Sequence, residues 1–128
     1  MYKLCLSLIL LLTSLFAVAG DDPSIKGKLR AEIQKTMQSH IEQTRIGNDY
    51  VLYDPIDGKL LKMKLEELHS GIVHKGDFYV SCADFRTEDG VLYDVDFMVA
   101  GERGQLRVYQ ALVHKAGKAK RDYHLEDL

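Results

Sequence analysis

Cysteine is scarce in this chain of 128 residues, which contains only Cys5 and Cys82. Cys5 lies in an apolar N-terminal stretch that we expect a signal peptidase to remove, so Cys82 is left alone in the mature chain. An intramolecular disulfide is therefore excluded, even in a compartment that would permit one. A single cysteine of this kind is most often buried as a small apolar side chain, and we expect this of Cys82.

A strong charge bias and the common active-site motifs are also missing. The formal net charge is −2, with no basic patch that would favour nucleic acid and no long run of like charges. No glycine-rich phosphate loop is present, because Gly101 and Gly104 flank an expected hairpin instead of opening a helix. The motifs thus predict no catalytic residue, no cofactor and no metal ligand.

The first twenty residues differ from the rest of the chain. Lys3 is their only charge, residues 4–18 are almost wholly apolar, and Ala17 and Ala19 are the small residues that a signal peptidase recognises. The alternative is an uncleaved membrane anchor, but the apolar run of about 15 residues is shorter than the roughly 20 needed to span a bilayer core. The sequence predicts a cleaved signal peptide over residues 1–20, export to the periplasm or the medium, and no membrane anchor afterwards.

Residues 21–128 are expected to form one domain that begins with a helix. Apolar residues recur every four positions at Ile25, Leu29, Ile33, Met37 and Ile41, which is typical of a helix with one buried face. Asp22-Pro23 suits the start of this helix, and Gly47-Asn48 suits its end.

The remainder of the chain predicts strands. Alternating apolar residues separated by turn residues indicate strands over 50–54, 59–65, 78–86, 91–100 and 105–115. Residues 66–71 fit either a helical turn or an irregular crossover, and the chain from about 116 is expected to be a loose charged tail that docks at 123–125. The predicted fold class is α+β, with one long N-terminal helix packed on a curved antiparallel meander of four to five strands.

The last three predicted strands have two different faces. If the hairpin loops 87–90 and 101–104 both hold an even number of residues, even positions on one strand share a face with odd positions on the next. One face is then almost continuously apolar and is expected to pack on the helix. Its members are Phe78, Val80, Cys82, Asp84, Tyr93, Val95, Phe97, Val99, Leu106, Val108, Gln110 and Leu112.

The opposite face mixes apolar side chains with acids, phenols, a hydroxyl and a guanidinium. Such a face is too apolar for a surface that only contacts solvent and too polar for a core, so we expect it to bind a partner or a ligand. The favoured interpretation is a non-enzymatic exported module that binds an unknown protein or small ligand, with a homodimer as one form of this. The candidate binding residues are Tyr79, Ser81, Asp94, Asp96, Arg107 and Tyr109.

An enzyme is one alternative. Asp94 and Asp96 lie two apart on one strand, so their carboxylates project the same way, roughly 6 to 7 Å apart. Like charges this close would raise one pKa and provide the general base of a small hydrolase or isomerase, with Tyr79 or Tyr109 as a donor. An ion pair between Asp96 and Arg107 would explain the same residues without catalysis.

A metal-binding protein is the other alternative. The chain contains His40, His69, His74, His114 and His124, and a zinc site needs three or four converging ligands. Although no subset forms a recognised ligand motif, His69 and His74 are the pair closest in sequence.

Two stretches carry a family resemblance. Residues 75–85 and 93–97 resemble small exported proteins of unassigned function. The order of elements from Pro23 to about Lys115 is similar to the cystatin-like group of folds, which implies a long helix wrapped by a curved antiparallel sheet. The inhibitor hairpin Gln-Val-Val-Ala-Gly is absent, and residues 71–76, the nearest match, lack its glutamine, so protease inhibition is not implied.

Overall fold

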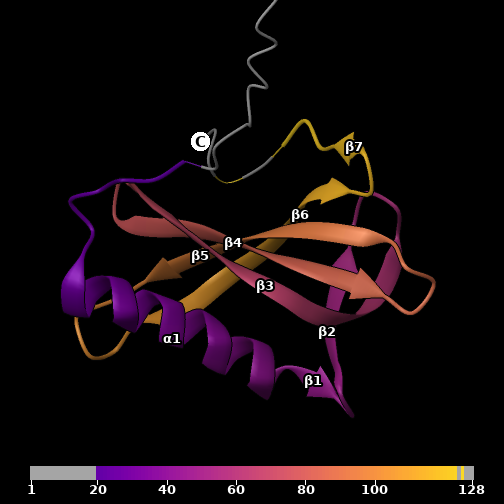
Figure 1. The fold of residues 1–128 in the computed structure, drawn as a ribbon, viewed down its shortest axis with the longest axis horizontal. Coiled ribbons are helices and arrows are strands. Elements are labelled where there is room, and N and C mark those ends of the chain that lie inside the picture. Colours follow the sequence, from indigo (N-terminus) through magenta and orange to yellow (C-terminus); the bar gives the residue numbers. More distant parts are fainter. Residues whose placement is uncertain (1–19, 124, 126–128) are drawn as a thin grey trace, which may run out of the picture.

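The structure is a computed structural model that describes residues 20–123 and 125, and these residues form one helix and seven strands (Figure 1). The strands form one antiparallel sheet whose spatial order follows the chain. The elements are α1 (Gly27–Gln43), β1 (Arg45–Ile46), β2 (Asp49–Asp54), β3 (Lys59–Lys75), β4 (Phe78–Thr87), β5 (Leu92–Ala100), β6 (Arg107–Ala116) and β7 (Ala119–Lys120).

The antiparallel sheet is confirmed, but the predicted fold class of a long helix on four to five strands is wrong. The described chain is mostly sheet, and α1 has only 17 residues. The main cause is residues 66–71, which stay in the sheet and make β3 a strand of 17 residues with irregularities between Leu65 and Glu67 and between Leu68 and Ile72. Two short strands, β1 and β7, add to the edges.

Helix α1 keeps its predicted buried face but not its predicted ends. Ile33, Met37 and Ile41 are buried as expected. The helix begins at Gly27 because the Asp22 carboxylate instead accepts hydrogen bonds from the amide and hydroxyl of Ser24, which form a turn. Gly47 and Asn48 connect β1 to β2 rather than ending the helix. Within the part of the chain that the structure describes, no helix is both long and apolar enough to cross a membrane.

The β4–β5 hairpin reverses the predicted faces of β4. The Thr87 amide donates to the Val91 carbonyl over 3.0 Å, which leaves three residues in the loop, and Gly90 takes a positive φ of 86°. Because this number is odd, Ala83 lies opposite Val95 and Cys82 lies opposite Asp96.

The prediction that Cys82 packs against the helix is therefore wrong, although its burial is confirmed. The side chains that join Val95 and Phe97 in the core with α1 are Ala83 and Phe85. We call the side of the sheet that faces α1 the helix side, and the opposite side, which carries Cys82 and Asp96, the outer face.

The faces of β6 agree with the prediction only near the β5–β6 loop. Val108 lies opposite Val99 on the helix side as expected. Tyr109 is then an extra residue in an irregularity of the pairing, so Ala111 lies opposite Phe97 and Val113 opposite Val95. From Gln110 to Val113, odd positions therefore join the helix side, and Gln110 and Leu112 lie on the outer face. His114 is a second extra residue, so Lys115 lies opposite Asp94 on the outer face and Ala116 opposite Tyr93 on the helix side.

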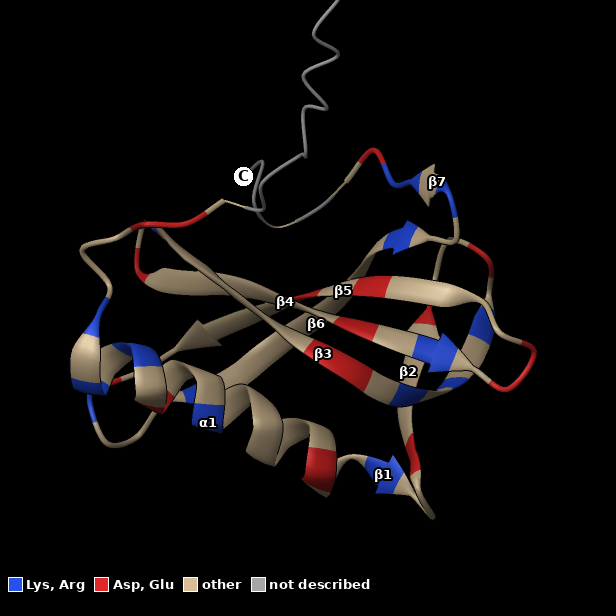
Figure 2. Cartoon of the chain, in the orientation of Figure 1, with Lys and Arg blue, Asp and Glu red and all other residues tan. Residues whose placement is uncertain are grey.

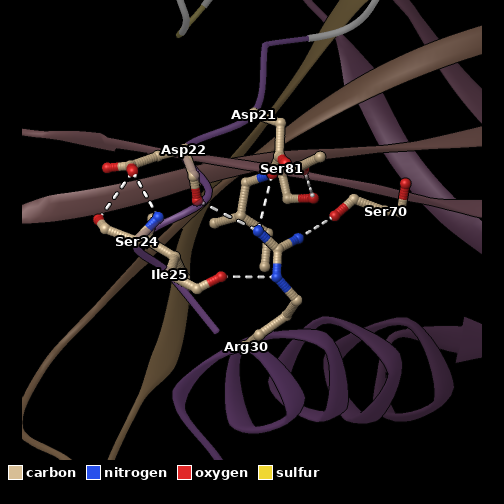
Figure 3. A network of polar contacts seen from close by, with 9 residues as sticks. Asp21, Asp22, Ser24, Ile25, Arg30, Ser70 and Ser81 are labelled. Atoms are coloured by element: carbon tan, nitrogen blue, oxygen red, sulfur yellow. Dashed lines mark hydrogen bonds and ion pairs between the residues drawn. The ribbon is translucent and has the colours of Figure 1, made fainter. Parts of the chain in front are cut away.

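Arg30 fastens the irregular part of β3 to the helix and to the segment before it (Figure 3). Its guanidinium donates to the carbonyls of Ile25 and Ser70 and to the Asp21 carboxylate, the last over 2.7 Å. Asp21 also accepts a hydrogen bond of 3.1 Å from the Ile72 amide. These contacts hold the bulge that contains Ser70, and with it the neighbouring His69, in a fixed place.

Arg121 fastens the chain after β7 to the turn between β2 and β3. Its guanidinium donates to Asp54 over 2.7 Å and to Asp57 over 3.1 Å. The Asp54 side chain is only 1% exposed, so this ion pair stabilises a carboxylate that would otherwise be buried without a counter-charge.

We predict that Arg121→Ala lowers the free energy of unfolding by about 2 to 4 kcal/mol, because it leaves the buried Asp54 carboxylate without a counter-charge. The matched control is Arg103→Ala, which removes an ion pair from a side chain that is 59% exposed and should cost at most about 1 kcal/mol. Urea unfolding followed by circular dichroism measures both. Equal effects of the two variants would contradict the prediction, as would a failure of Asp54→Asn to recover stability in the Arg121→Ala background.

Candidate functional site

Acidic residues of three neighbouring strands lie side by side on the outer face (Figure 2). Glu67 of β3 lies opposite Asp84 of β4, which lies opposite Asp94 of β5. Like charges directly opposite each other destabilise a sheet. Such a row therefore needs compensating partners. Lys115 lies opposite Asp94 on β6, and two histidines also reach the row.

Two overlapping groups of potential metal ligands lie on this face. Cys82, Asp94, Asp96 and His114 each offer one ligand atom, and these atoms lie within 4.8 Å of one another. We call this group the Cys82 cluster. His69, Asp84 and Asp94 satisfy the same criterion, and we call them the His69 cluster. Asp94 belongs to both.

The strand register brings these side chains together. The β4–β5 hairpin places Cys82 opposite Asp96 and Asp84 opposite Asp94. His114 is an extra residue of β6 between Val113, opposite Val95, and Lys115, opposite Asp94, and its Nδ1 lies 3.0 Å from Asp96 Oδ1 on the outer face. His69 comes from the irregular part of β3, between Leu68 and Ile72.

Asp96 is the most buried member of the Cys82 cluster, with a relative exposure of 0%. Its Oδ1 accepts a hydrogen bond from the Cys82 thiol over 3.0 Å and lies 3.0 Å from His114 Nδ1. Its Oδ2 accepts a hydrogen bond of 3.0 Å from the backbone amide of Leu125. Leu125 is itself buried, so the C-terminal segment covers this carboxylate.

The carboxylate of Asp94 has fewer hydrogen-bond partners than that of Asp96. Its Oδ1 is buried and has no hydrogen-bond partner among residues 20–123 and 125, and its Oδ2 lies 4.0 Å from His114 Nδ1. Burial raises the pKa of Asp94, and the neighbouring His69 and His114 oppose this rise only in part. A buried, poorly paired carboxylate is costly, and such groups concentrate at functional sites.

The His69 cluster is closer to solvent. His69 Nε2 lies 2.9 Å from Asp84 Oδ1, and the two side chains are 21% and 23% exposed. This pair therefore presents one imidazole and one carboxylate that water can reach.

The structure does not bring all six predicted binding residues together. Asp94 and Asp96 share the outer face. Tyr79 packs against the helix-side core, and Ser81 is buried with its hydroxyl bonded to the Gly71 carbonyl. Arg107 and Tyr109 are exposed on β6. Asp96 forms its described contacts with Cys82, His114 and Leu125 rather than with Arg107.

Four members of the two clusters were not among the predicted binding residues: His69, Cys82, Asp84 and His114. Of these, His69 was named in the sequence analysis as a zinc ligand, but with another partner. The sequence interpretation placed Cys82 and Asp84 against the helix because it counted the β4–β5 loop as even. The available signal was Asp89-Gly90, since a glycine after a type I turn is typical of a three-residue hairpin loop. The suggested partner of His69 was His74, which stacks on Tyr79 at 4.7 Å and belongs to neither cluster. His124 lies outside the described residues.

We predict that Asp94→Asn makes the metal-free protein more stable at pH 7. Because the folded-state pKa of Asp94 is raised, its ionised form costs stability above that pKa. The cost disappears below the ordinary aspartate value of about 3.9, where the carboxyl group is protonated in both states.

The stability difference between Asp94→Asn and the unaltered chain should therefore shrink as the pH falls from 7 towards 4. Thermal unfolding at a series of pH values, in the presence of a chelator, measures it. Glu88→Gln, an exposed position in the β4–β5 loop, is the control and should show no such gain. A loss of stability in Asp94→Asn at pH 7 would contradict the argument.

Comparison with known proteins adds no assignment, because no family model, curated protein or solved structure matches the chain. The case for a function therefore depends on the chemistry of the two clusters.

Proposed function

We propose that the protein binds a transition-metal ion of the zinc class at the Cys82 cluster. The cluster offers a thiol, an imidazole and two carboxylates, which are the ligand types that zinc takes in proteins. Ligand atoms bound tetrahedrally about 2.0 to 2.3 Å from one zinc ion lie roughly 3.3 to 3.8 Å apart. The four donors, all within 4.8 Å of one another, would need to move inward by at most about 1 Å.

The single observation that carries this proposal is Asp94 Oδ1, which is buried without a hydrogen-bond partner among the described residues. Hydrogen bonds alone account for Asp96, whose two oxygens are fully used. They do not account for Asp94, which lies beside it with a raised pKa. A bound cation would neutralise this carboxylate and satisfy its buried oxygen.

The hydrogen bonds around Asp96 indicate how binding would proceed. Cys82 and His114 both lie 3.0 Å from one oxygen, Asp96 Oδ1. A metal ion would replace the thiol proton and any proton on the coordinating nitrogen, since cysteine binds metals as the thiolate and histidine through a neutral ring. The Leu125 amide would remain on Asp96 Oδ2 and keep the carboxylate oriented towards the ion.

The other interpretations have less support. A partner-binding face built from all six predicted residues stays a prediction, and only Asp94 and Asp96 of that set lie together in a cluster. An acid-base enzyme would need Tyr79 or Tyr109 beside Asp94 or Asp96. Tyr79 packs against the helix-side core and Tyr109 is exposed, so neither phenol supports that mechanism.

We predict that Cys82→Ser and His114→Ala each weaken Zn²⁺ binding at least about 100-fold, because even the groups that orient metal ligands change affinity by 10- to 100-fold. Competition with a chromogenic chelator measures the affinity. His74→Ala is the control, since His74 is exposed and outside both clusters, and it should bind as tightly as the unaltered protein. Binding of Zn²⁺ that is unchanged in Cys82→Ser and His114→Ala would refute this site.

We also predict that Zn²⁺ affinity falls as the pH is lowered. A proton that must leave the thiol before the metal binds lowers the affinity about tenfold for each pH unit below the pKa of the thiol. Isothermal titration calorimetry in buffers with different ionisation enthalpies counts the released protons. Cys82→Ser should release fewer protons than the unaltered chain, and an equal number would argue against ligation by the thiolate.

A further inference from the structure

The two clusters share Asp94, and we infer that the outer face holds a second divalent metal ion bound by His69, Asp84 and Asp94. This inference rests on the proposed ion at the Cys82 cluster. It adds a neighbouring binding position, and the first ion could bind without the second.

Geometry provides the first argument. The donors of His69, Asp84 and Asp94 lie within 4.8 Å of one another, and His69 Nε2 is already 2.9 Å from Asp84 Oδ1. A carboxylate has two oxygens, so Asp94 can give one to each ion. In protein sites with two metal ions, the ions are about 3.5 to 4 Å apart, which a bridging carboxylate permits.

Charge provides the second argument. The ligands of the Cys82 cluster are a thiolate, two carboxylates and a neutral imidazole once the ion is bound. One divalent ion would leave this group anionic, with the Asp84 carboxylate opposite Asp94 on the next strand. A second divalent ion balances the anionic side chains of the two clusters, which are Cys82, Asp84, Asp94 and Asp96.

The two positions differ in access to solvent. In the Cys82 cluster, Cys82 and Asp96 are 3% and 0% exposed and the His114 side chain 14%. The side chains of His69 and Asp84 are 21% and 23% exposed, and the shared Asp94 is 23% exposed. Three protein ligands leave one coordination position open, as in zinc sites that bind water or a small ligand. The second ion would therefore bind more weakly, exchange faster and carry a water molecule or a small oxyanion.

The fold also fixes the position of His69, which could not be predicted from its spacing in the sequence. His69 precedes Ser70, whose carbonyl accepts a hydrogen bond from Arg30 of α1 (Figure 3). Asp21 binds both Arg30 and the amide of Ile72 on the other side of the bulge. The irregular part of β3 is thus held at Ser70, in its middle, and at Ile72, where it ends, which lowers the entropic cost of keeping the imidazole of His69 next to Asp84.

The experiment counts bound metal in the purified protein and in variants of the second position only. Metal-free protein is dialysed to equilibrium against buffered Zn²⁺, and the bound zinc is measured by elemental mass spectrometry. We expect about two ions per chain for the unaltered protein and for His74→Ala, but about one for His69→Ala and Asp84→Asn.

Titration with Co²⁺ separates the two positions, because only the Cys82 cluster contains a thiolate. The thiolate-to-cobalt charge-transfer band should saturate with the first equivalent and persist in His69→Ala and Asp84→Asn, which also shows that those variants still fold. In the unaltered protein, a second equivalent of Co²⁺ should add the absorption of the cobalt ion itself without increasing the charge-transfer band.

The outcomes distinguish the two proposals. One ion per unaltered chain, with the charge-transfer band present, would overturn the second ion and leave the first in place. No bound ion would overturn both. Two ions in His69→Ala and Asp84→Asn would place the second ion elsewhere and reject this site.

Discussion

The Asp96 carboxylate is buried under the C-terminal segment, and much of the outer face is arranged around it. A charge withdrawn from water is strongly destabilising unless hydrogen bonds or a counter-charge replace its hydration. Three parts of the chain provide those bonds: β4 through Cys82, β6 through His114, and the C-terminal segment through the amide of Leu125. The register of β4, β5 and β6 must therefore be correct before this residue can be tolerated at all.

Helix α1 and the outer face depend on each other through the same sheet. The apolar side chains of β4 and β5 pack against Ile33, Met37 and Ile41, and their alternation leaves the intervening positions to the other side. A shift of one residue would place Asp94 and Asp96 in the helix-side core. The hydrophobic core thus selects the register, and the register in turn assembles the polar clusters.

The sequence predicted what depends on local periodicity and missed what depends on counting residues in turns. The buried positions of α1 and the two faces of β5 followed from spacing alone. The burial of Cys82 followed from its residue type, whereas spacing placed it on the wrong side of the sheet. One residue, Thr87, decided the orientation of the whole of β4, because the side-chain period of a strand is two. The prediction counted it in the loop, whereas it ends β4 and bonds to Val91.

The other features that the sequence did not predict depend on contacts between distant parts of the chain. The extra residues Tyr109 and His114 of β6 and the irregular part of β3 near His69 interrupt the pleat. The irregular part of β3 is stabilised by contacts with segments far away in the sequence. Arg30 of α1, for example, binds Ser70, forty positions later. Spacing along the chain therefore gave Asp94 and Asp96 as a pair, whereas His69 and His114 could be added only from the folded sheet.

The position of Leu125 sets the order in which the buried site can be completed. All the side chains that surround Asp96 belong to hairpins of consecutive strands, which form quickly once synthesised, whereas the amide that covers it follows the last strand. The proposed ion would therefore meet an open surface around Asp96 during folding. In the folded protein Leu125 covers Asp96, and the ion would have to enter past the partly exposed side chains of Asp94 and His114.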